Sequence, residues 1–138
     1  MQVLFLTTPG LIDTHWWSVA YLLDEAVEQV SDEYTLADLA AMVCDGAAVA
    51  ALVLDDDGSP MLALVFRFVN YPRSTAVHIM ALGGRNLADA AMTFWRQFTE
   101  WAKESGATRI EACALPAMTR VLRALGFQHR YNFLRVEV

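Results

Sequence analysis

The sequence predicts a single α/β (α+β) domain over residues 1–138, with a mixed sheet in which an antiparallel meander is followed by β-α-β-α-β. Three observations lead to this fold class. Apolar runs of strand length, separated by turn residues, fill the middle of the chain. After these strands come two amphipathic segments with helical spacing, and one more short apolar run lies between them. The length suffices for one hydrophobic core and is too small for two domains.

The first third of the chain predicts a strand and two helices. Residues 2–8 have the character of a strand and stop at Pro9-Gly10, which is a turn signal. Apolar side chains recur at helical spacing over Asp13–Gln29. A second helix over Thr35–Gly46 opens with the spacing of a capping box and ends on a glycine.

The middle of the chain predicts the meander. Its strands are Ala47–Leu54, Met61–Val69 and Thr75–Leu82, joined by a turn at Asp55–Gly58 and a connection at Tyr71-Pro72. Because sequential strands with short connections pair side by side, we expect these three to be antiparallel neighbours.

The last third predicts helix, strand, helix and strand. A long helix spans Leu87–Ser105, and the strand Thr108–Cys113 returns parallel to the third strand of the meander, as a right-handed crossover requires. A shorter helix over Ala117–Leu125 begins after Pro116, where a missing amide proton costs least. An aromatic-rich terminal strand closes the predicted fold.

Composition argues against several classes of protein. Apolar residues make up 56% of the chain and charged residues 19%, which excludes disorder. We expect no membrane span and no signal peptide, and a net charge of −6 argues against nucleic-acid binding. Cys44 and Cys113 are expected to be buried free thiols in a reducing cytoplasm. The three histidines lack metal-ligand spacing, so we expect no metal site.

The whole pattern resembles the GNAT superfamily of acetyltransferases. Residues 122–127 read Leu-Arg-Ala-Leu-Gly-Phe before an aromatic-rich segment, as at the end of a GNAT domain, and the order of elements is the GNAT order. More narrowly, the chain resembles small GNAT-like proteins of tailed bacteriophages in Trp16-Trp17, Thr35–Leu39, Tyr71-Pro72 and Trp101–Gly106. This resemblance implies a protein of the cytoplasm of a bacterial host or of the virion.

The GNAT resemblance also implies a glycine-rich loop that binds the phosphates of acetyl-CoA at the start of the long helix, and this chain departs from that pattern. Residues 86–91 hold neither glycine. Asp89 places a carboxylate in the first turn instead, where repulsion from a diphosphate costs about 1–4 kcal/mol. One interpretation is a displaced anion nest that binds acetyl-CoA just upstream. The other is a tight strand-to-helix turn at the two glycines, with an asparagine capping the helix. The residues concerned are Leu82, Gly83, Gly84, Arg85 and Asn86.

The set of residues that a GNAT enzyme uses for proton transfer is incomplete in this chain. Many GNAT relatives have an Asn early in the last helix and a Tyr that protonates the departing thiolate, but this chain has Leu115 and Leu122 there. Tyr131 is a candidate substitute, although an aromatic residue on a final strand is also typical of a core. His78 and Glu111, on neighbouring predicted strands, are the candidates for a general base. A structural or exposed histidine is the alternative.

Two adjacent tryptophans, Trp16 and Trp17, cannot both face the core from one helix. One of them therefore reaches the surface or a groove. It covers a seam between helix and sheet, or it anchors a protein partner, since tryptophan is enriched among interface hot spots.

These departures favour a bacteriophage accessory protein that acts by binding, in virion assembly, as an internal virion component or on a host protein, with degenerate acetyltransferase chemistry. The expected partner is a phage or host protein or a second copy of the chain, and not a nucleic acid or a membrane. The alternative is an active acetyl-CoA-dependent N-acetyltransferase with an atypical phosphate loop at Gly83-Gly84-Arg85.

Overall fold

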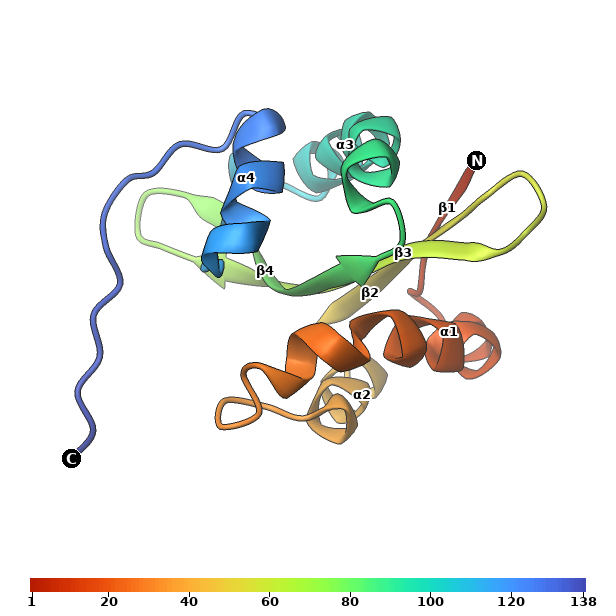
Figure 1. Ribbon diagram of the computed structural model, residues 1–138, viewed down its shortest axis with the longest axis horizontal. Coiled ribbons are helices and arrows are strands. Elements are labelled where there is room, and N and C mark those ends of the chain that lie inside the picture. The colour runs from red at the N-terminus through yellow and green to blue at the C-terminus, as the bar shows by residue number, and fades with distance from the viewer.

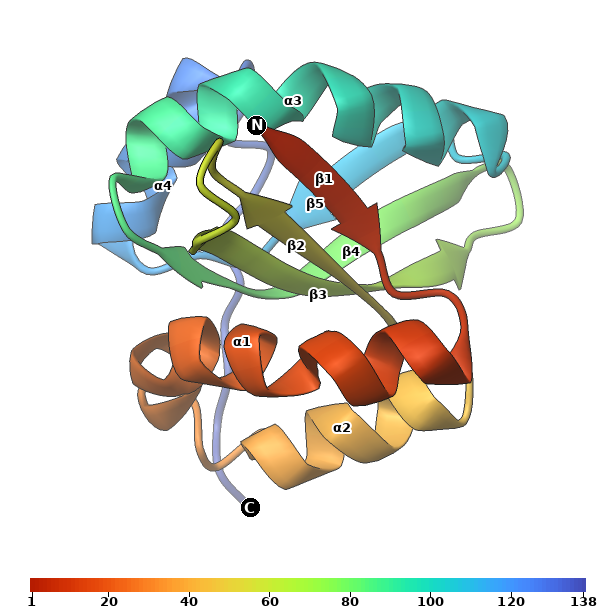
Figure 2. The same cartoon turned by 90° about the vertical axis from the view of Figure 1, so that its right-hand side faces the viewer.

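A five-stranded mixed sheet separates two layers of helices in the computed structural model, which describes all of residues 1–138. Helices α1 and α2 cover one face of the sheet, and α3 and α4 cover the other (Figures 1 and 2). The strands are β1 (Gln2–Phe5), β2 (Val49–Leu54), β3 (Pro60–Asn70), β4 (Thr75–Gly84) and β5 (Arg109–Ala112). The helices are α1 (Pro9–Glu28), α2 (Leu36–Cys44), α3 (Leu87–Glu104) and α4 (Pro116–Ala124).

The strands follow one another across the sheet in the order β1-β2-β3-β4-β5. Neighbours from β1 to β4 are antiparallel, so the predicted meander is confirmed. Strand β5 lies parallel to β4, with Ala76 opposite Arg109 and Ile79 opposite Ala112. This parallel return after α3 is the crossover that the sequence predicts.

The first helix begins earlier than the sequence pattern indicates. Pro9 and Gly10 do not form a turn but are the first residues of α1. The Thr8 hydroxyl accepts a hydrogen bond from the backbone N–H of Leu11 at 3.2 Å, which satisfies one of the free amides of the first turn. Pro9 occupies the position where it loses no helical hydrogen bond. A threonine directly before the proline is therefore the feature that makes this dipeptide a helix start.

The predicted terminal strand is absent. Residues 128–138 form an exposed tail without secondary structure, which leaves α4, passes the sheet and ends beyond the α1–α2 layer (Figures 1 and 2). The guanidinium of Arg135 holds this tail by ion pairs to Glu33 and, at 3.8 Å, to Asp32. The aromatic spacing suits a strand, but the edge strand β5 offers only four residues for pairing.

The hydrophobic core has two parts, one on each face of the sheet. The part under α3 contains a stack of Phe5 on Trp101, with ring centroids 4.6 Å apart, and an edge-to-face contact of Phe66 with Phe98. The part under α1 and α2 is mainly aliphatic. The cysteines belong to neither part: Cys44 and Cys113 are free and exposed, so their predicted burial is wrong.

The capping box of α2 is present, because Thr35 and Asp38 bond each other's backbone N–H. No helix in the chain combines the length and the apolar character needed to cross a membrane.

Candidate functional site

Strand β5 is shorter than β4 and pairs with only part of it, which leaves an open edge on β4. Pairing with β5 stops at Ile79, whereas β4 continues to Gly84. The backbone from Met80 onwards therefore has no strand partner on that side. The hydroxyl of Tyr34, from the loop between α1 and α2, donates a hydrogen bond to the Met80 carbonyl oxygen. The pKa of the Tyr34 phenol is raised, mainly by burial and to a smaller extent by the negative charge of Glu33.

Three polar side chains meet beside the last paired residues of these strands. His78 and Glu111 lie opposite each other in the register of β4 and β5, and His78 Nδ1 is 3.3 Å from Glu111 Oε1. The Tyr71 hydroxyl, from the connection between β3 and β4, donates to the same carboxylate oxygen at 2.6 Å. This bond raises the pKa of the Tyr71 phenol, because it stabilises the protonated form.

This cluster brings together the two residues that the sequence marks as general-base candidates. A carboxylate that accepts from one ring nitrogen fixes the orientation and the tautomer of a histidine. Sequence reasoning missed Tyr71, because a residue in a connection carries no strand periodicity. Tyr131, the third candidate, is 80% exposed on the tail, so it has neither the strand position nor the core packing expected for it.

The two glycines expected at the phosphate site have a packing role. Gly83 and Gly84 are the last two residues of β4 and do not have positive φ, so they form neither the nest nor the tight turn. A Cβ on Gly83 would lie 2.5 Å from the carbonyl oxygen of Leu22 in α1. A Cβ on Gly84 would lie 2.2 Å from the carbonyl oxygen of Met61 in β3. Glycine is therefore required at both positions by the close approach of two backbones.

The residues that follow also depart from the pattern expected of a diphosphate site. The guanidinium of Arg85 donates one hydrogen bond to the Pro60 carbonyl oxygen, at 2.7 Å. Asn86 is at the N-cap position of α3 with φ 48° and makes no side-chain cap bond, so it does not cap the helix as predicted. Asp89 is exposed in the first turn of α3 and brings negative charge to the place where the phosphates would lie.

The position expected for the general acid is apolar and closed. Leu122 is 5% exposed and belongs to the core between α4 and the sheet, so no polar group replaces the missing tyrosine there. Leu115, at the start of α4, is 50% exposed and provides no amide side chain.

The paired tryptophans differ in their environments. Trp16 is half-buried against the core below α1, whereas Trp17 is 80% exposed. Tyr21, one helical turn after Trp17, is also 80% exposed, and both residues line an open hollow of about 410 Å³ to which Leu36 of α2 also contributes. Sequence reasoning missed Tyr21, although its spacing of four residues from Trp17 places both on one face of the helix.

No family model and no curated protein matches the chain. Solved structures match it along its whole length. A ribosomal-protein-alanine N-acetyltransferase from Brucella melitensis biovar Abortus 2308 has a TM-score of 0.72 at 14% identity, with all of both chains covered. A probable acetyltransferase has a TM-score of 0.74 at 14% identity, over 100% of this chain and 97% of that chain.

An aminoglycoside acetyltransferase from an uncultured soil metagenomic sample has a TM-score of 0.69 at 13% identity, over 99% of this chain and 97% of that chain. At such low identities these comparisons establish the fold and not the activity. The chain therefore has the single-domain GNAT acetyltransferase fold, and its function has to be argued from its own residues.

Proposed function

We propose that this chain is a GNAT-fold protein that acts by binding another protein through the outer surface of α1. The observation that carries the proposal is the exposure of Trp17, which at 80% leaves nearly the whole ring in water beside the equally exposed Tyr21. Soluble proteins usually hide clustered large aromatic rings. Tryptophan and tyrosine are also the side chains that most often dominate the binding energy of an interface.

The proposed setting is a bacteriophage accessory protein, made in the cytoplasm of a bacterial host, that assists virion assembly or modulates a host protein. Support for it comes from the residues that resemble tailed-phage proteins, among them Trp16-Trp17 and Trp101–Gly106. The partner is a phage or host protein, or a second copy of this chain.

A loss of acetyltransferase chemistry accompanies this proposal. Three departures from the cofactor-site pattern support it: Gly83 and Gly84 serve packing, Arg85 donates to the Pro60 carbonyl oxygen, and Leu122 is buried. The aromatic side chains of Trp17 and Tyr21 on α1, by contrast, lie largely outside the core.

The test is a pull-down from infected bacteria with tagged wild-type protein and the variant Trp17→Ala, followed by measurement of the affinity for the recovered protein. The variant should bind on the order of 2 kcal/mol more weakly, which is roughly thirtyfold, with an almost unchanged melting temperature. Met92→Ala is the matched control, since Met92 is 59% exposed on α3, on the opposite face. Sedimentation reports self-association. A monomer whose recovered proteins bind Trp17→Ala equally well would refute the proposal.

A second function rests on the cluster of His78, Glu111 and Tyr71 beside the open edge of β4. In this alternative the chain is an acetyl-CoA-dependent N-acetyltransferase, and His78, oriented by Glu111, accepts a proton from the acceptor amine. Calorimetric titration with acetyl-CoA separates the two functions. Binding that is lost in Arg85→Glu would favour the enzyme, and no heat of binding would favour the binding protein.

A further inference from the structure

The charges of the chain are divided between its two halves. Residues 1–66 contain eleven aspartates and glutamates and no lysine or arginine, and all ten basic residues come later. Because α1, α2 and the loop between them lie within residues 9–44, the acidic side chains of this layer have no basic residue of their own layer to pair with. On the other face, α3 carries charges of both signs and α4 carries two arginines and no acidic residue.

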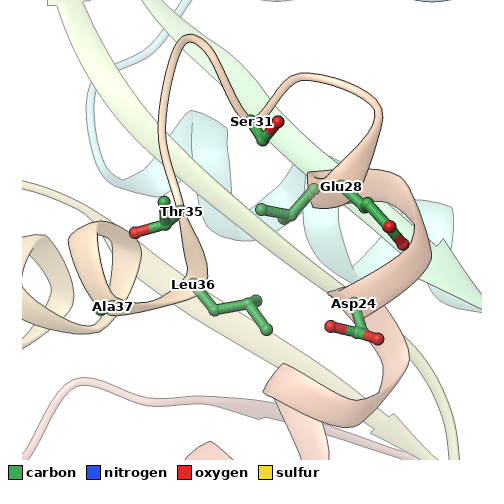
Figure 3. A pocket seen from close by; sticks show the side chains of 7 residues that line it. Asp24, Glu28, Ser31, Thr35, Leu36 and Ala37 are labelled. Carbon is green, nitrogen blue, oxygen red and sulfur yellow. The ribbon is translucent and has the colours of Figure 1, made fainter.

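Part of this negative charge lies beside the exposed aromatic rings. Trp17, Tyr21, Asp24 and Glu28 are spaced by three or four residues, so they share one stripe of α1. The hollow beside the rings adjoins a second one of about 480 Å³, since Asp24 and Leu36 line both. Figure 3 shows Leu36 extending from the start of α2 towards α1, where Asp24 and Glu28 lie one turn apart. We call this the α1–α2 groove, lined by Trp17, Tyr21, Asp24, Glu28 and Leu36.

The carboxylates of the groove have no cationic partner. None of the ion pairs in the chain involves Asp24 or Glu28. Like charges four residues apart on a helix repel each other, so the free protein carries a repulsion that a bound cation would relieve. The loop at the end of the groove shows this chemistry within the chain, since its Asp32 and Glu33 hold the guanidinium of Arg135.

We propose that the α1–α2 groove binds an arginine-rich segment of a partner protein. This inference rests on the proposed binding function and narrows it to one partner chemistry. A guanidinium stacks on Trp17 or Tyr21 and presents its fork of N–H donors to the carboxylate of Asp24 or Glu28. The aliphatic part of each arginine, or an apolar residue between two of them, packs on Leu36. An acidic segment meets repulsion at the same positions.

The test measures binding of a fluorescein-labelled peptide of alternating arginine and leucine to the full chain by fluorescence anisotropy, at low and high salt. The Arg peptide should bind, and more weakly as salt rises. The double variants Asp24→Asn/Glu28→Gln and Trp17→Ala/Tyr21→Ala should each weaken binding at least about tenfold. The charge-matched control Asp57→Asn/Glu104→Gln removes two carboxylates outside the groove and should change binding less than about twofold.

Three outcomes would overturn the proposal: no binding of the Arg peptide, equal loss in the charge-matched control, or equal binding of a peptide with glutamate in place of arginine. If the Arg peptide fails while the recovered partner still depends on Trp17, the partner chemistry is wrong and the proposed function stands. If the Arg peptide does not bind and the recovered partner does not depend on Trp17, both the partner chemistry and the proposed function are wrong. A peptide of residues 128–138, which carries Arg130 and Arg135, is the test for self-association. Tighter binding of that peptide would make a second copy the occupant and refute a separate partner.

Discussion

Replacing Gly83 by alanine should destabilise the protein, because the added methyl group has no room between β4 and α1. The new Cβ would lie 2.5 Å from the Leu22 carbonyl oxygen, 3.4 Å from the Leu22 carbonyl carbon and 3.6 Å from the Leu23 Cα. All three are backbone atoms, so no side chain can rotate away. Helix α1 would have to withdraw by at least about 0.5 Å, and overpacking of this kind costs about 1–3 kcal/mol.

The measured loss should be smaller than the steric cost, because alanine also lowers the entropy of the unfolded chain. That effect offsets about 0.4–1 kcal/mol. The expected net loss is about 1–2 kcal/mol, and a chain of this size should melt about 3–8 °C lower. Thermal unfolding followed by far-ultraviolet circular dichroism measures this shift.

Gly10→Ala, in the helix α1 against which Gly83 packs, is the matched control. Nothing lies within 4 Å of a Cβ at Gly10, and its φ is not positive. This substitution should leave the melting temperature unchanged or raise it by up to a few degrees. If Gly83→Ala melted within about 1 °C of the wild type, the close approach of α1 would not be the reason for this glycine, and a role in anion binding would regain support.

Three further predictions concern the cofactor, the tail and the pH dependence. Millimolar acetyl-CoA should leave the melting temperatures of the wild type and of Arg85→Glu unchanged; since a hundredfold excess over the dissociation constant stabilises by about 2.7 kcal/mol, a shift of several degrees would contradict this. Deleting residues 128–138 should lower the free energy of unfolding in urea by no more than about 1 kcal/mol, because exposed ion pairs hold the tail; a larger loss would indicate strand pairing. The raised pKa of Tyr34 means that the folded state holds the phenolic proton more tightly than the unfolded chain. The free energy of unfolding should therefore fall as the pH rises above the ordinary value of 10.0. Because the pKa of Tyr71 is raised as well, Tyr34→Phe should reduce this fall without abolishing it.

Much of the fold was predictable because its signals are local. The capping box at Thr35 and the apolar periodicity of α3 fix two helices without knowledge of their neighbours. The predicted terminal strand is absent because an alternating pattern of side chains describes a strand but does not provide a partner strand for it. The packing role of Gly83 was hidden for a related reason: the backbone that excludes a side chain there belongs to Leu22, sixty-one positions earlier in the chain.

The candidate site was predictable only in its parts. His78 and Glu111 stand on strands that the sequence places side by side, but whether they are directly opposite depends on the register of β4 and β5. Tyr71 joins them from a connection whose path no periodicity describes. That one of Trp16 and Trp17 is exposed follows from helical geometry alone, whereas the hollow beside Trp17 depends on how α2 lies against α1.

The uneven distribution of charge makes the molecule an electric dipole, with its negative end at the layer of α1 and α2. Beyond the Debye length of about 8 Å at physiological ionic strength this field is largely screened, so it acts only during the final approach of two molecules. There it exerts a torque that turns the α1–α2 groove towards a cationic surface before any atoms touch. Such orientation speeds productive encounters, and rising salt should slow association more than it hastens dissociation.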